Sequence, residues 1–140
     1  MLFYIIMILA IIFFIGVIKM SLIKISADEF DKVLESKETC VMIFSKETCS
    51  VCKTLAPIAE KVSEEFKNQI KFYSLTVSDP ETLLRFRDLK LLGVPQTVFF
   101  LKGEKDTALP GGLTEAILKK ETKKLLNSSK GFLGKLKSMF

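Results

Sequence analysis

The apolar positions divide the chain into three parts, and the first is an unbroken apolar run. Residues 1–18 read MLFYIIMILAIIFFIGVI and contain no charged side chain. A helix of this length rises about 27 Å, close to the roughly 30 Å thickness of a bilayer's hydrocarbon core. The run therefore predicts a transmembrane anchor over residues 1–20, and we expect a single-pass protein of a cell membrane, of bacterial type.

Two alternatives for this apolar run stay open. A secretory signal has a basic segment before its apolar core and a small-residue cleavage site after it, and this run has neither. A cleaved leader and a chain that starts at Met20 are the alternatives to an anchor. Lys19 and Lys24 follow the run, whereas only the α-amine precedes it. The positive-inside rule then favours a cytoplasmic position for the rest of the chain, with an extracytoplasmic position as the alternative.

The second part, residues 21–127, alternates between strand and helix patterns. The run CVMIF at residues 40–44 is typical of a central strand that is buried on both faces. Apolar residues then recur at helical spacing over residues 49–68. Similar patterns predict strands at 22–25, 70–77, 97–101 and just before 110, and helices that end near 35, 90 and 126. This order predicts one α/β domain with a central mixed β-sheet flanked by helices.

Capping signals mark where three of these helices begin. Ser26 and Glu29 have the spacing of a capping box. Ser78 and Glu81 have the same spacing, with a proline between them near the first turn. Thr114 follows a glycine pair and is the expected cap of the last helix.

The third part, residues 128–140, is a lysine-containing tail. Its apolar residues fall on one helical face, and its lysines lie mostly off that face. This pattern predicts a basic amphipathic segment that binds anionic membrane lipid, with a disordered tail as the alternative.

Charge and composition narrow the functional classes. The net charge of +5 is accounted for by residues 114–140, which hold seven lysines and two acidic residues. Because residues 1–113 are neutral overall, we expect no nucleic acid as a partner. The chain has no His and three Cys, which excludes Cys–His and Ser–His nucleophile pairs and argues against a resident metal. We expect no cofactor.

One motif carries chemistry: Cys49-Ser50-Val51-Cys52 directly follows a predicted buried strand and opens a predicted helix. The free N–H groups and the positive dipole end of a helix N-terminus favour a thiolate there, and a thiolate is the attacking species in disulfide exchange. Half of a zinc site, or a metal cluster shared between chains, is the alternative. Cys40 opens the preceding strand, where we expect a buried free thiol; a regulatory or intermolecular disulfide is the other interpretation.

Three motifs together resemble the thioredoxin family. They are CSVCKTLAP from Cys49, Gly93-Val94-Pro95 followed by a hairpin, and Gly111-Gly112 before the last helix. The resemblance covers roughly residues 21–127 and implies a thioredoxin fold. It implies that Cys49 is the nucleophile, that Cys52 is the resolving thiol, and that Pro95 is a cis-proline facing them. It also implies that Thr48, Val94 and Pro95 bind the substrate.

The chain also departs from the family pattern. Thr48 stands where the family usually has Trp, Ser50-Val51 stands between the cysteines in place of Gly-Pro, and Ile43 stands in place of a buried Asp. Glu47 is the nearest acid in sequence to that position. The departures favour a dedicated role with one partner over general disulfide reduction.

Two functions follow as hypotheses. The first is a membrane-tethered thiol–disulfide oxidoreductase that exchanges disulfides with partner proteins through Cys49 and Cys52. The second is a redox-inactive adaptor of the same fold that holds a partner at the membrane.

Overall fold

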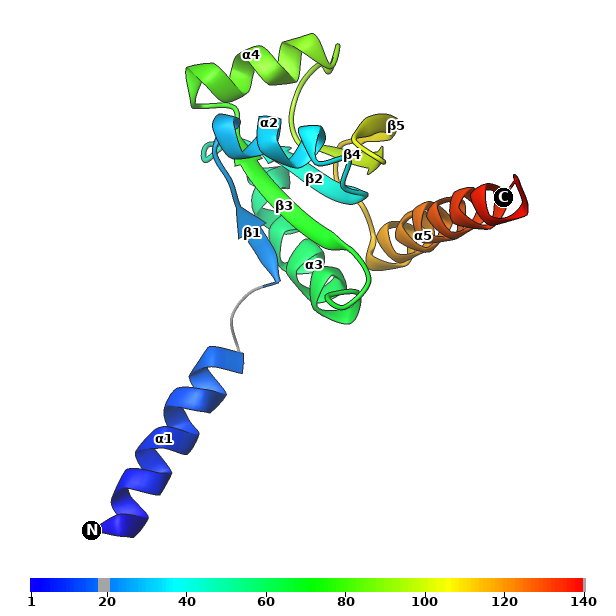
Figure 1. Ribbon diagram of the computed structural model, residues 1–140. Helices are drawn as coiled ribbons and strands as arrows, with labels where there is room; N and C mark the ends of the chain where they lie inside the picture. The colour runs from blue at the N-terminus through cyan, green and yellow to red at the C-terminus, as the bar shows by residue number, and fades with distance from the viewer. Residues whose placement is uncertain (18–20, 140) are drawn as a thin grey trace.

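The computed structural model describes residues 1–17 and 21–139, and the side chains of 1–13 and 21–131. The chain begins with helix α1 (Leu2–Val17), which lies apart from the remaining elements in Figure 1. A five-stranded sheet and four further helices follow. The predicted tail face lies on residues whose side chains are outside this described part, so the tail's amphipathic character stays a prediction.

The transmembrane anchor predicted over residues 1–20 lies only partly within the described residues. Helix α1 has 16 residues in that part. Within residues 1–17 and 21–139, no helix combines the length and the apolar character that crossing a membrane requires. The expected anchor extended over residues 18–20, which lie outside the described residues.

The sheet has the strand order β1-β3-β2-β4-β5. The first three of these strands run parallel to one another, and β4 and β5 run antiparallel to their neighbours. The mixed sheet predicted from the sequence is therefore confirmed. The strands are β1 (Leu22–Lys24), β2 (Cys40–Ser45), β3 (Lys71–Thr76), β4 (Gln96–Leu101) and β5 (Glu104–Pro110).

Helices cover both faces of the sheet (Figure 1). Helices α2 (Ala27–Glu35) and α4 (Pro80–Asp88) pack on one face, and α3 (Ser50–Glu65) and α5 (Glu115–Met139) pack on the other. The central strand β2 explains why CVMIF is apolar throughout: Met42 and Phe44 enter the α2/α4 core, whereas Val41 and Ile43 enter the α3/α5 core. Alternate residues of a strand point to opposite faces, so a strand covered on both sides needs apolar residues at every position.

Two of the predicted helix starts are confirmed, and a third has a different cap. Ser26 and Glu29 form a complete capping box on α2, and Thr114 Oγ1 accepts the Ile117 amide at the start of α5. At α4 the cap is Asp79 rather than Ser78, because the Asp79 side chain accepts the amide of Thr82. A carboxylate in this position also interacts favourably with the positive end of the helix dipole.

The last helix is longer than the sequence pattern indicates. We expected it to end near Leu126, but α5 continues to Met139. Its first half packs on the sheet through the buried side chains of Leu118, Thr122 and Leu125. Its second half extends beyond the sheet (Figure 1).

Candidate active site

The site is built where β2 ends and α3 begins. Strand β2 is buried, and the chain leaves it through a short turn in which the Cys49 amide donates to the carbonyl of Lys46 at 3.1 Å. Cys49 is then the N-cap residue of α3, with an extended backbone (φ −93°, ψ 115°). The first helical turn brings Cys52 back to it, and the Cys52 amide donates to Cys49 Sγ at 3.2 Å. A thiol in the N-cap position thus receives a helix N–H that has no carbonyl partner.

The two thiols have different environments. Cys49 is half-buried, Cys52 is 6% exposed, and both are free thiols, as is the buried Cys40. The hydrogen bond from the Cys52 thiol lowers the pKa of Cys49 below its ordinary value of 9.0, and the amides of Cys52 and Val51 act in the same direction. Burial raises the pKa of Cys52 above 9.0, and the hydrogen bond to Cys49 raises it further. The accessible thiol is therefore the one that ionises first.

The cis-proline loop lies against Cys49. The Val94–Pro95 peptide bond is cis, as the resemblance implied. The Cys49 thiol donates a long hydrogen bond to the Val94 carbonyl at 3.9 Å. Val94 is half-buried and Pro95 is buried, whereas Thr48 is exposed one residue before Cys49. The structure thus brings Val94 and Pro95 to the nucleophile across 45 residues of sequence, and Thr48 reaches the site only as a chain neighbour.

The glycine turn completes the rim of the site. The Gly111 amide donates to the Pro95 carbonyl at 2.9 Å. A Cβ atom on Gly112 would stand 3.2 Å from Cγ1 of Val51, the residue between the two cysteines. This is closer than the usual 3.5–4.0 Å contact between carbon atoms. The three motifs quoted from the sequence therefore converge on one surface.

Two features of the site were not predicted from the sequence. Gln96 is buried and donates from Nε2 to the carbonyl of Leu92 at 2.9 Å, which holds the loop ahead of Pro95. The backbone N–H of Lys46 stabilises the Cys52 thiolate and so opposes the rise in the Cys52 pKa. A glutamine directly after a Val-Pro pair is a sequence signal that could have indicated the role of Gln96. The contact of the Lys46 backbone leaves no trace in the sequence.

Behind the thiols, Cys52 lines a cavity of about 340 Å³ whose wall includes Ser45, Ser74 and Glu47. Ile43, in the position of the family's buried acid, is 5% exposed and lines an adjoining cavity. Glu47 supplies a carboxylate to the wall, and its Oε2 accepts from Ser78 Oγ at 2.9 Å. No group of three Cys, Asp or Glu side chains able to hold a metal ion is found in the described part of the chain.

A half-exposed thiol of lowered pKa, paired with a buried thiol one helical turn away, defines a dithiol redox site. A family model described as Thioredoxin matches residues 21–124. The chain therefore belongs to the thioredoxin family.

Individual relatives are similar to the same region. Thioredoxin from Buchnera aphidicola subsp. Schizaphis graminum is 31% identical over 100 residues, which are 70% of this chain and 90% of that protein. Thioredoxin M-type, chloroplastic, from Pisum sativum is 25% identical over 104 residues, which are 73% of this chain and 59% of that protein. The corresponding protein of Brassica napus is 28% identical over 95 residues, 67% of this chain and 52% of that protein. The chain thus spans little more than half the length of these two chloroplastic relatives.

Proposed function

We propose that this chain is a thiol–disulfide oxidoreductase that exchanges disulfides with partner proteins through Cys49 and Cys52. The observation that carries the proposal is the arrangement of the two thiols: Cys49 is the half-buried N-cap of α3 and accepts the Cys52 amide at 3.2 Å, whereas Cys52 is 6% exposed. This arrangement lowers the pKa of Cys49 and raises the pKa of Cys52. Membership of the thioredoxin family supports the same chemistry.

In the reducing direction the reaction has two steps. The Cys49 thiolate attacks one sulfur of a partner disulfide, forms a mixed disulfide, and releases the partner's other sulfur as a thiolate that takes a proton. Cys52 then loses its proton and attacks Cys49 Sγ, which forms the Cys49–Cys52 disulfide and releases the second partner thiol. The partner gains two electrons and this chain loses two, and the reverse sequence oxidises a partner dithiol.

Substrate binding follows from the surface around Cys49. Val94 and Pro95 present an irregular loop next to the nucleophile, and an extended partner segment lies along it with its disulfide at Cys49. Thr48 borders the same opening with an exposed side chain. A threonine offers far less apolar contact area than the Trp usual at this position, so binding depends more on the partner's own complementarity.

The reduction of insulin disulfides with dithiothreitol as electron donor tests the proposal. The wild type is compared with Cys49→Ser and Cys52→Ser, with Cys40→Ala as the matched control because Cys40 is 0% exposed. Activity lost in the first two variants and kept in the third supports the proposal. Equal activity in all four proteins contradicts it and favours the redox-inactive adaptor.

The proposal includes attachment to a membrane through α1. Its large apolar side chains from Leu2 to Phe13 are exposed, from 46% at Ile8 to 86% at Phe3. A helix that is apolar on all sides needs an apolar environment, and the hydrocarbon region of a lipid bilayer provides one. The side of the membrane on which the redox site lies stays a prediction.

Co-sedimentation with vesicles of neutral phosphatidylcholine tests this attachment. We expect the full chain to sediment with the vesicles and a chain without residues 1–20 to stay in solution. If both proteins stay in solution, the proposed membrane attachment is wrong. If size-exclusion chromatography then shows the full chain as a dimer, α1 pairs with a second copy of the chain.

A further inference from the structure

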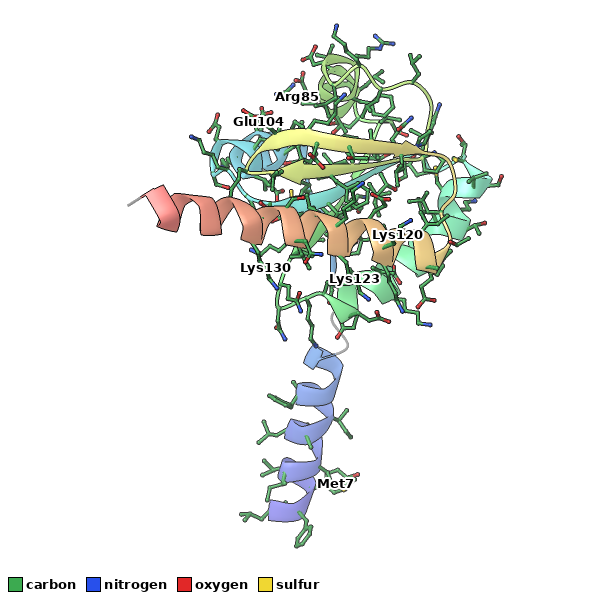
Figure 2. All side chains as sticks on the ribbon, turned by 90° about the vertical axis from the view of Figure 1, so that its right-hand side faces the viewer. Met7, Arg85, Glu104, Lys120, Lys123 and Lys130 are labelled. Atoms are coloured by element: carbon green, nitrogen blue, oxygen red, sulfur yellow. The ribbon has the colours of Figure 1, made fainter. Side chains whose placement is uncertain are left out.

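Helix α5 has one face made of exposed lysines. Lys120, Lys123, Lys124 and Lys130 are exposed at helical spacing, and we call these four residues the α5 lysine face. They lie opposite the buried side of the helix, which packs on the sheet. Figure 2 shows Lys120, Lys123 and Lys130 distributed along the helix.

The charge of this face is not neutralised by the protein. The neighbouring Lys119 pairs with Glu115 at 2.8 Å and Glu65 at 3.0 Å, which satisfies its charge. In the described part of the chain, no carboxylate lies within ion-pair distance of the four members of the face. Four like charges this close together repel one another, so an anionic partner relieves a cost that is present in the free protein.

The shape of the face suits a surface with many anions. Lys120, Lys123 and Lys124 line an open surface along one side of α5, together with Ala116, Asn127 and Ser128. Each cation on the face is a lysine, whose ammonium group is a compact charge on a flexible side chain. The face has no arginine, the residue whose planar guanidinium binds a single carboxylate or phosphate in a bidentate manner. Flexible point charges fit a dense array of phosphates better than one oriented group.

The apolar helix of the same chain indicates which phosphate array this is. Helix α1 presents apolar side chains on all sides, and Figure 2 shows it extending from the molecule below α5. We propose that the α5 lysine face binds the anionic lipid headgroups of a membrane surface, as the second contact beside α1. The proposal rests on the membrane attachment proposed for α1 and is independent of the thiol chemistry.

Vesicle co-sedimentation of the full chain tests this contact. One set of vesicles is pure phosphatidylcholine, and the other contains 30% phosphatidylglycerol, on the order of the anionic content that gives a membrane a strong surface potential. The test variant is Lys120→Gln/Lys123→Gln/Lys124→Gln. The control variant, Lys32→Gln/Lys37→Gln/Lys90→Gln, removes the same charge from exposed lysines of the α2/α4 layer on the other face of the sheet.

The two lipid mixtures separate the two contacts. Binding to neutral vesicles reports α1, and the gain on adding phosphatidylglycerol reports the α5 lysine face. Each lysine near an anionic surface contributes roughly fivefold to binding. We therefore expect the test variant to bind anionic vesicles roughly 100-fold more weakly than the wild type, with neutral vesicles unaffected. At 1 M salt the wild type should lose the gain as well, because the screening length falls to about 3 Å.

Three results would overturn the proposal. The first is equal binding of the wild type to both kinds of vesicle. The second is an equal loss in the test and control variants, which would show that only net charge matters. The third is tight binding of a 20-nucleotide single-stranded DNA through the same three lysines without any gain on anionic vesicles, which assigns the face to nucleic acid. Insulin reduction by the test variant should equal that of the wild type, so this outcome is separate from that of the redox proposal.

Discussion

Thr97 provides a sharp test of how the buried sheet is stabilised. It lies on β4 directly opposite Ile43, its side chain is 0% exposed, and its hydroxyl has no hydrogen-bond partner among the described residues. A buried polar group without a partner costs about 1–3 kcal/mol. Replacing the hydroxyl with a methyl group of the same shape removes that cost, so Thr97→Val should raise the free energy of unfolding by about 1–2 kcal/mol.

Thr122→Val is the matched control for this substitution. Thr122 is also 0% exposed, but its hydroxyl donates to the Leu118 carbonyl at 2.7 Å. The same substitution there removes a formed hydrogen bond and should lower the free energy of unfolding by about 0.5–1 kcal/mol. Both residue types are β-branched, so the backbone preference changes little at either position.

Urea unfolding followed by far-ultraviolet circular dichroism measures both variants, since the chain has no Trp to serve as a fluorescent probe. With a urea slope of about 1–3 kcal/mol per M, the Thr97→Val midpoint should rise by about 0.3–2 M. A Thr97→Val midpoint that falls, as the Thr122→Val midpoint is expected to do, would show that the Thr97 hydroxyl makes a hydrogen bond and that the reasoning is wrong.

Three further predictions concern the core, a turn and the nucleophile. Phe44→Ala should lower the free energy of unfolding by about 3–5 kcal/mol in the same urea experiment, because the 0% exposed ring fills the α2/α4 core, whereas Phe44→Leu should cost less than about 1.5 kcal/mol. Gly103→Ala should lower the free energy of unfolding by at least about 1–2 kcal/mol, because φ at Gly103 is +80° and the new Cβ would meet the Leu34 carbonyl oxygen at 2.5 Å. An unchanged urea midpoint would contradict this prediction. The rate of Cys49 alkylation by iodoacetamide, followed by mass spectrometry, should have its pH midpoint below 9.0 and fall tenfold per pH unit below that midpoint, and Cys52→Ala should move the midpoint upward. A midpoint that Cys52→Ala leaves unmoved would remove the Cys52 thiol as the main cause of the lowered pKa.

The sequence predicted those parts of the fold whose signals are local. The apolar run of β2, the capping box at Ser26 and the Cys-x-x-Cys at a helix start each depend on residues within one or two turns of chain. These predictions are confirmed in the structure. The cis bond before Pro95 was reached through the family resemblance, because the sequence shows a proline but not the state of its peptide bond.

The parts that could not be predicted depend on contacts between distant residues or on competition between similar signals. The approach of Gly112 to Val51 joins residues that are far apart in sequence. At α4, Ser78 and Asp79 are both good caps, and the structure uses the one whose side chain reaches the amide of Thr82. Helix α5 continues through Gly131. Glycine disfavours a helix by only about 1 kcal/mol relative to alanine, and this cost is too small to end a helix by itself.

The anchor over residues 1–20 stays a prediction. The apolar run covers residues 1–18 of the sequence, whereas the described helix α1 covers Leu2–Val17. The expected anchor therefore includes residues outside the described part of the chain.

Trapping of the mixed disulfide tests the central claim most directly. In Cys52→Ser the resolving step is removed, so a protein disulfide that Cys49 attacks should remain covalently attached. Intact-mass analysis under non-reducing conditions, followed by peptide mapping, measures the adduct and locates it. The account predicts one substrate chain bound to Cys49 in Cys52→Ser, and no adduct in Cys49→Ser/Cys52→Ser. An adduct on Cys40, or equal amounts of adduct in the two variants, would contradict the assignment of Cys49 as the nucleophile.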